Sequence, residues 1–172
     1  SSFNNELDIK LLNNYNKIIF SNYDLDSSLF DSFENNNFQD LKYISSKFNK
    51  PVDNLQSTIT HLTFGYYFNQ SVDNLPPLIT HLTFGWDFNQ TVDNLPSSIT
   101  HLNFCSNFNQ LIDNLPPLIT HLTFGNDFNE TVDNLPSTIT HITFDWNFNQ
   151  SIDNLPSSII HLTFGLRFNQ PV

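Results

Sequence analysis

The stretch Ile79-Thr-His-Leu-Thr-Phe-Gly85 decides the fold, because variants of it recur along the chain with a spacing of 20 residues. All six histidines keep this spacing: His61, His81, His101, His121, His141 and His161. Two phenylalanine columns keep it as well, from Phe64 to Phe164 and from Phe48 to Phe168. Self-similarity at such a period predicts a solenoid, in which each repeat forms one coil that stacks on its neighbours. Six units fill residues 48–167, and residues 168–172 begin a seventh.

Within a unit, the apolar pattern predicts one strand and an irregular return. Leu62-Thr63-Phe64 alternates apolar and polar residues, which indicates a short strand from about His61 to Gly65 with His61 and Thr63 facing outward. Gly65 then allows a tight turn, through either a positive φ or a close approach of the backbone. The other apolar positions fit neither a sustained helix nor a long strand: Ile59, Phe68, Val72 and Leu75.

These features together predict the fold class. We expect a leucine-rich-repeat-like right-handed coil of 20-residue units with one short parallel β-strand per unit. Leu75-Pro76 marks the return side, which we expect to be irregular or 3₁₀ because proline resists a regular helix.

Residues 1–47 differ in composition from the repeats, being rich in Asn, Ser and acidic residues. Ile18-Ile-Phe20 has the spacing of a strand, and Leu41-Lys-Tyr-Ile44 copies the spacing of Ile59-Thr-His-Leu62. A separate small module is one interpretation. We favour an N-terminal cap of degenerate repeats, because a solenoid needs its apolar end covered.

The formal net charge of −11 argues against two classes of partner. Nucleic acid and anionic membranes favour clustered Lys and Arg, and five of the six basic residues precede residue 51. No run has the apolar length of a transmembrane helix. The single cysteine, Cys105, excludes an internal disulfide framework, and we interpret it as a tolerated substitution for glycine.

Several observations bear on location and on the chain ends. No charged-then-apolar leader opens the sequence, and four glycosylation sequons fall in an asparagine column that we expect to point inward, at Asn69, Asn89, Asn129 and Asn149. We therefore expect an intracellular protein, in the cytoplasm of a cell or host or associated with a virion. The absence of methionine suggests processing or a longer parent chain. We also expect the array to continue past Val172, or two copies to meet end to end there, because the last strand would otherwise have an open edge.

The unit Leu-Pro-x-x-Ile-Thr-His-Leu-Thr-Phe-Gly-x-x-Phe-Asn-Gln resembles the FNIP repeat, a leucine-rich-repeat-like unit of slime-mould and giant-virus proteins. The Phe-Asn-x-Pro signature stands at residues 48–51 and 168–171, and the resemblance covers residues 48–172. Many proteins of this family carry an F-box before the repeats, which implies a substrate-receptor role in ubiquitin ligases. Residues 1–47 show no convincing F-box pattern, so that role stands only as an alternative.

Stacking turns repeated polar residues into columns. We expect the asparagine column, from Asn49 to Asn169, to be buried and to bond backbone groups of its own and neighbouring turns. The aspartate column can accept backbone N–H groups in Asx-turns or, as the less favoured alternative, bind calcium: Asp53, Asp73, Asp93, Asp113, Asp133 and Asp153. The histidine column invites three interpretations, which are metal capture, ice binding together with the neighbouring threonines, and a structural ladder. We favour the ladder, because zinc needs converging ligands.

Catalysis finds no support in the sequence. Every His, Asp and Ser recurs from unit to unit, whereas an active site is one asymmetric constellation. We therefore expect a protein that is not an enzyme, with no catalytic residues, no cofactor and no metal.

The two positions after each glycine position vary while their surroundings are nearly fixed. They read Tyr66-Tyr67, Trp86-Asp87, Ser106-Asn107, Asn126-Asp127, Trp146-Asn147 and Leu166-Arg167. Drift at unconstrained loop positions is one explanation, but four aromatic residues favour recognition. We expect a protein-interaction scaffold whose partner, possibly basic, contacts Tyr66, Tyr67, Trp86, Asp87, Asn126, Asp127, Trp146, Asn147 and Arg167. The histidine column is a secondary candidate face, and a self-assembling structural array is a second candidate function.

Overall fold

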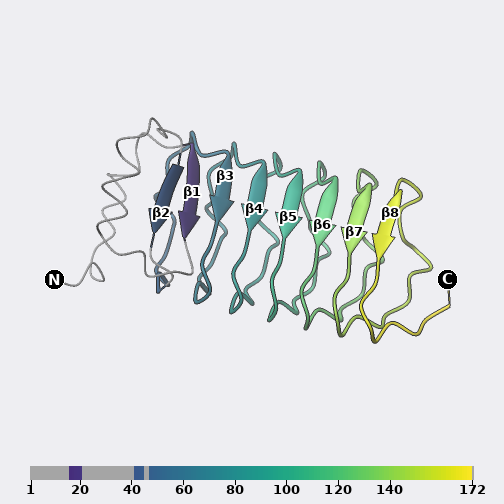
Figure 1. Cartoon of the computed structure of the whole chain (residues 1–172). Helices are drawn as coiled ribbons and strands as arrows, with labels where there is room; N and C mark the ends of the chain where they lie inside the picture. The colour runs from purple at the N-terminus through teal and green to yellow at the C-terminus, as the bar shows by residue number, and fades with distance from the viewer. Residues whose placement is uncertain (1–15, 21–40, 45–46, 172) are drawn as a thin grey trace.

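The repeats form the coils of a parallel β-solenoid. The computed structural model describes residues 16–20, 41–44 and 47–171, with only the backbone of residues 20 and 41–44. Eight parallel strands form one sheet in the order β2-β1-β3-β4-β5-β6-β7-β8 (Figure 1). The strands are β1 (Lys17–Phe20), β2 (Leu41–Ile44), β3 (His61–Thr63), β4 (His81–Thr83), β5 (His101–Asn103), β6 (His121–Thr123), β7 (His141–Thr143) and β8 (His161–Thr163).

Each repeat strand has three residues, and its central leucine or isoleucine is buried in β3 to β7. In β4, Leu82 is buried between the half-buried His81 and Thr83, which confirms the predicted alternation. The strand ends at Thr83, two residues earlier than the spacing predicted, although the next backbone N–H still bonds across: Phe84 N–H donates to the Asn103 carbonyl at 2.9 Å. Strict register pairs His81 with His101 and Leu82 with Leu102, so every column runs straight along the solenoid.

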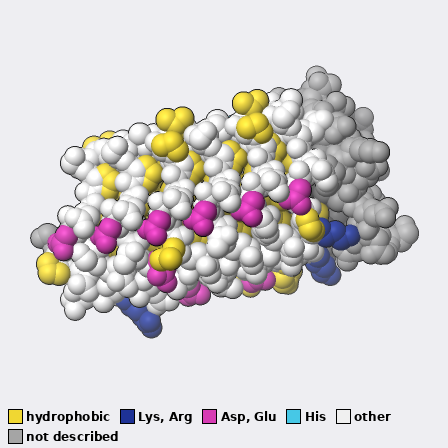
Figure 2. All heavy atoms as spheres, turned by 180° about the vertical axis from the view of Figure 1, so that it is seen from behind, with side chains coloured by type: hydrophobic (Ala, Val, Ile, Leu, Met, Phe, Trp, Pro, Cys, Tyr) yellow, Lys and Arg dark blue, Asp and Glu magenta, His cyan; other side chains and the backbone are white. Residues whose placement is uncertain are grey.

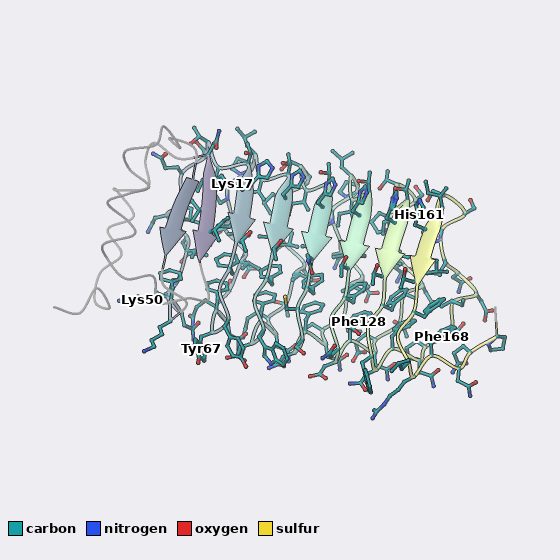
Figure 3. All side chains as sticks on the ribbon, viewed as in Figure 1. Lys17, Lys50, Tyr67, Phe128, His161 and Phe168 are labelled. Carbon is teal, nitrogen blue, oxygen red and sulfur yellow. The ribbon has the colours of Figure 1, made fainter. Side chains whose placement is uncertain are left out.

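The core consists of the six apolar columns that the sequence predicts. The phenylalanines are the largest of its fully buried side chains, and they stack both within a turn and between turns. Phe84 lies 3.7 Å from Phe88 and 5.4 Å from Phe104 between ring centroids, with interplanar angles of 9°. Figure 3 shows Phe128 and Phe168 inside the coil. The described return side consists of turns and bends with no 3₁₀ helix, so the irregular alternative is correct there.

The glycines that follow four of the repeat strands allow close approach of the backbone, although Cys105 and Asp145 stand at the same position in the other two units. A Cβ atom at Gly85 would overlap the carbonyl oxygen of Gly65, and one at Gly125 would overlap that of Cys105. Neither glycine has a φ in the left-handed region. Of the two reasons offered by the sequence, close approach is therefore the correct one.

The two N-terminal strands extend the sheet, but in an order that the sequence does not indicate. β1 pairs directly with β3, and β2 pairs with the outer edge of β1. Through β1, Leu41 is in register with His61, and Lys42 with Leu62. The proposed alignment of Leu41 with Ile59 is therefore wrong by two positions. Most of the remaining residues of the predicted cap lie outside the described part of the chain.

For the asparagine column, the structure contradicts the predicted burial and confirms the predicted bonds to neighbouring turns. The column is not buried: Asn89 and Asn149 are exposed, and Asn69 and Asn129 are half-buried. It does bond the backbone of neighbouring turns, since Asn109 N–H donates to Asn89 Oδ1 at 3.0 Å. The inward orientation that we expected to prevent glycosylation is therefore wrong.

The aspartate column forms a ladder of cross-turn contacts. Asn94 Nδ2 donates to Asp73 Oδ1 at 3.2 Å, and Asn114 Nδ2 donates to Asp93 Oδ1 at 3.2 Å. Side-chain amides of the next turn thus supply the donors that we had expected from the backbone in Asx-turns. Acidic side chains form a line along the face that lies behind the sheet (Figure 2).

Candidate functional site

The variable positions after each glycine form one margin of the solenoid, which we call the rim (residues 66–67, 86–87, 106–107, 126–127, 146–147 and 166–167). A second backbone ladder joins successive turns here. Asp87 N–H donates to the Tyr66 carbonyl at 2.9 Å, and Asn107 N–H donates to the Trp86 carbonyl at 3.0 Å. The rim side chains therefore project from a hydrogen-bonded backbone. Rim positions of neighbouring turns are as far apart as neighbouring strands of the sheet.

Aromatic side chains dominate the N-terminal part of the rim. Tyr66 and Trp86 stack across one turn, with ring centroids 5.6 Å apart and an interplanar angle of 8°. The rings of Tyr67 and Tyr66 are also in contact, with centroids 4.8 Å apart and an interplanar angle of 60°. Trp86 is 45% exposed and Tyr67 is 48% exposed, and Figure 3 shows Tyr67 at the lower margin of the coil. This group presents a broad apolar surface whose rings hold each other in place.

Polar side chains run beside the aromatic ones and are linked to one another. Asn107 Nδ2 donates to Asp87 Oδ1 at 3.4 Å. Farther along, Asn147 Nδ2 donates to Asp127 Oδ1 at 3.1 Å, and Arg167 Nη1 donates to Asn147 Oδ1 at 2.8 Å. The carboxylates of the rim thus keep free lone pairs for a donor from outside, while one side of each is already bonded.

Trp146 lies apart from the other aromatic rim residues. It is 46% exposed, but Ser106 and Asn126 occupy the two intervening turns, which puts it three turns from Trp86, or ~14 Å at strand spacing. Ser106 is buried and Asn126 is half-buried. The sequence placed all four aromatic residues on one surface. The structure brings Tyr66, Tyr67 and Trp86 together and leaves Trp146 as a second, separate point.

The histidine column lies on the outer face of the sheet, with its rings stacked. Centroids of consecutive rings are 4.2 Å apart for His61 and His81, 4.2 Å for His81 and His101, and 4.3 Å for His101 and His121. The interplanar angles are 12°, 10° and 10°. Figure 3 shows Lys17 and His161 near opposite ends of this face, and Lys17 is in register with His61.

A threonine holds in place the ring of the histidine that follows it. Thr100 Oγ1 lies 2.9 Å from His101 Nδ1 and 3.2 Å from the Thr80 carbonyl oxygen, so the hydroxyl bridges the ring and the backbone of the preceding turn. The same pair of contacts repeats at Thr60, Thr80, Thr120 and Thr140.

Sequence reasoning missed this contact between threonine and histidine. The signal was present as a repeated Thr-His dipeptide, but the carbonyl that the hydroxyl also contacts lies 20 residues earlier and cannot be identified from the sequence. In the last unit Ile160 replaces the threonine, so His161 has no such hydroxyl beside it.

Burial and mutual repulsion favour the neutral form of these rings. Desolvation lowers the pKa of His101 below 6.5, and the neighbouring His81 and His141 lower it further. Desolvation also lowers the pKa of His61, with Lys17 as the next cause. Burial and nearby positive charge thus both favour the neutral form of His61 and His101.

Three further features of the described residues bear on chemistry. Nowhere in this part of the chain do three or more His, Cys, Asp or Glu side chains converge well enough to hold a metal ion. None of the described segments forms a helix with the length and apolarity needed to cross a bilayer. Leu78 and Leu118 are exposed on one corner of the coil, where other units have Ser or Thr, and the sequence analysis had not singled them out.

Comparison with known families agrees with this geometry. The profile described as FNIP Repeat matches residues 71–106, 88–127, 108–146 and 148–172. The first three segments overlap, the fourth follows them along the solenoid, and together they cover more than half of the chain. No curated protein matches the chain significantly. The chain belongs to the FNIP repeat family.

Proposed function

We propose that this protein is a non-catalytic interaction scaffold that binds a protein partner through the rim. A repeat solenoid of this kind suits such a role, because its core columns hold the backbone rigid while the exposed columns are free to vary. The observation that carries the proposal is the stacked group of Tyr66, Tyr67 and Trp86. Its rings stack on one another, and those of Tyr67 and Trp86 are nearly half exposed.

The chemistry of the rim limits the class of partner. Large aromatic side chains are frequent anchors at protein interfaces, where they bury much area and lose little side-chain entropy. Asp87 lies directly after Trp86, and Asp127 lies two turns farther along. An apolar segment flanked by Lys or Arg would place its apolar groups on the rings and its cations near these carboxylates. The net charge of −11 favours the approach of a basic partner. We propose that the protein binds this partner in an intracellular compartment.

The test compares two double variants that each remove two apolar side chains from the surface. Tyr66→Ala with Trp86→Ala removes the stacked pair, and Leu78→Ala with Leu118→Ala removes exposed leucines from another corner. Both should keep a melting temperature within a few degrees of the parent chain. Peptides selected from a displayed random library against the parent chain should bind the leucine variant unchanged. They should bind the aromatic variant ~2 kcal/mol or more weakly. Equal binding to both variants would rule out the aromatic group as the binding surface.

A self-assembling structural array is the second candidate function, because a solenoid stacks nearly identical turns along one axis. Sedimentation velocity separates the two functions: a concentration-independent monomer supports the partner-binding scaffold, and an open series of oligomers supports the array.

A further inference from the structure

We propose that this protein forms a weak, closed dimer with a second copy of itself through one corner of the coil. The corner consists of the two positions that precede the buried isoleucine of each central turn. We call it the corner strip (residues 77–78, 97–98, 117–118 and 137–138). In each turn the strand lies between the corner strip and the rim, so this contact goes beyond the proposed function.

Bulky and small residues alternate along the corner strip from turn to turn. Pro77-Leu78 and Pro117-Leu118 form the bulky turns, and the two leucines are 54% and 53% exposed. The turns that follow them have Ser97-Ser98 and Ser137-Thr138. The bulky turns are two strand spacings apart, or ~10 Å. Figure 2 shows hydrophobic side chains as separate projections along the upper edge of the solenoid. Each leucine is therefore a ridge with a lower turn beside it.

The small residues of the corner strip already use their hydroxyl groups within the chain. Ser98 Oγ donates to the Pro77 carbonyl at 2.8 Å, and Thr138 Oγ1 donates to the Pro117 carbonyl at 2.9 Å. An apolar side chain can therefore cover either residue without leaving its hydroxyl proton unbonded. The prolines of the bulky turns have no backbone N–H that would lose a partner when covered.

This alternation is complementary to itself under a two-fold axis that makes the two solenoids antiparallel. When the axis passes between the turns of Ser98 and Leu118, Leu118 lies opposite Ser98 of the second copy. Leu78 then lies opposite Thr138 of the second copy. The axis generates each contact twice, so all four leucines of the dimer meet a small residue. Parallel solenoids related by an axis along their length would instead put Leu78 against Leu78. The pattern therefore favours a second copy in the antiparallel orientation, and such a pair is closed.

The distribution of charge permits this contact but limits its strength. Residues 76–84 and the matching positions of the other units contain no Asp, Glu, Lys or Arg. Each copy nevertheless has a net charge of −11, so long-range repulsion opposes the dimer at low salt. The strip has two residues in each of four turns, or eight per copy, against about 20–30 per partner in a standard interface. We therefore expect self-association at ~0.1–1 mM protein.

Two complementary variants test whether the alternation carries the contact. Leu78→Ser with Leu118→Ser makes all four turns small, and Ser98→Leu with Thr138→Leu makes all four turns bulky. Each substitution introduces a residue that the same position already has in another turn, so both variants should fold. Circular dichroism and urea melts check this. Sedimentation equilibrium between ~10 µM and ~1 mM then measures the self-association of each chain and of an equimolar mixture of the two variants.

The parent chain should form dimers and no larger species. Each variant alone should dimerise at least about tenfold more weakly, because small turns have no ridge to insert and bulky turns collide. The mixture should form dimers of about parent affinity, since every leucine again faces a small residue. A non-specific apolar patch would give the opposite result, because the bulky variant would associate more tightly than the parent chain. That result, a mixture without recovery, a parent chain that stays monomeric at ~1 mM, or growth beyond the dimer would each overturn the proposal.

Amide spectra of the parent chain locate the contact independently of these variants. Shifts in ¹H–¹⁵N spectra that depend on concentration should occur at the corner strip and be absent from the rim. Tyr66→Ala with Trp86→Ala should dimerise as the parent chain does, which separates this contact from the proposed binding surface. Raising NaCl from about 50 mM to about 500 mM should strengthen the dimer, because screening reduces the repulsion between copies. Shifts confined to the rim, or weaker association at high salt, would refute the inference.

Discussion

The phenylalanine stack should make the central turns far more sensitive to truncation than the last one. Phe104 is 1% exposed, and it contacts Phe84 at 5.4 Å, Phe108 at 3.8 Å and Phe124 at 5.6 Å between ring centroids. Burying a phenylalanine contributes about 1.5–3 kcal/mol by transfer alone, and each ring pair adds about 0.5–1.5 kcal/mol. Partial relaxation around the cavity limits the sum, so Phe104→Ala should lower the free energy of unfolding by ~3–5 kcal/mol.

Phe164→Ala is the matched control, because it removes the same side chain from the same column. Phe164 is only half-buried, and its column neighbour lies on one side alone, at Phe144. Its truncation should lower the free energy of unfolding by about half as much as that of Phe104. Urea melts followed by far-UV circular dichroism measure both values, and hydrogen exchange reports whether turns on the two sides of Phe104 uncouple. Equal midpoints for the two variants would show that stacking between turns does not govern stability.

Three further predictions concern the surface columns. The pKa values of His81 and His101 are lowered, chiefly by desolvation, so these neutral rings contribute stability that is present above the unfolded pKa of about 6.5. The melting temperature should therefore fall as pH drops from 6.5 toward 5, and a rise would contradict this sign. Asn89→Ala should destabilise the chain by ~1 kcal/mol in urea melts, since Asn109 N–H loses its acceptor, whereas Asn89→Asp should retain most of the stability. Gly125→Ala should lower stability by ~1–3 kcal/mol because its Cβ would overlap the backbone of Cys105, and an unchanged melt would disprove the need for close approach.

The sequence predicts the core well because each core column depends on local spacing. Leu82 and Phe84 are two residues apart, and this alternation alone places both side chains on the inner side of a strand. The period then repeats the result in every turn. The end of the strand is less well predicted, since the last backbone bond of Phe84 reaches a carbonyl in the next turn.

The polar columns are predicted less well because their partners lie one turn away. Asn94 bonds Asp73, which is 21 residues earlier, and nothing near Asp73 in the sequence distinguishes this contact from an Asx-turn. Asn89 lies at a corner of the coil, and its burial depends on whether its side chain there faces the core or solvent. The spacing of apolar residues does not determine which way a polar side chain at a corner points. The order of β1 and β2 in the sheet cannot be predicted from the sequence for a similar reason. A strand whose pattern fits the sheet can lie either next to β3 or at the outer edge.

The rim and the histidine column differ in what a partner can recognise. A ligand that moves by one turn along the histidine column, from His81 to His101, meets the same threonine contact and the same ring spacing. Binding there can be multivalent, but it cannot fix a register. A ligand that moves by one turn along the rim exchanges Trp86 for the small and buried Ser106. Since specificity is a difference between affinities, the rim makes neighbouring registers unequal, whereas the histidine column does not. A partner that binds at one place on this solenoid must therefore contact a column that varies from turn to turn, and the rim varies most in side-chain size and charge.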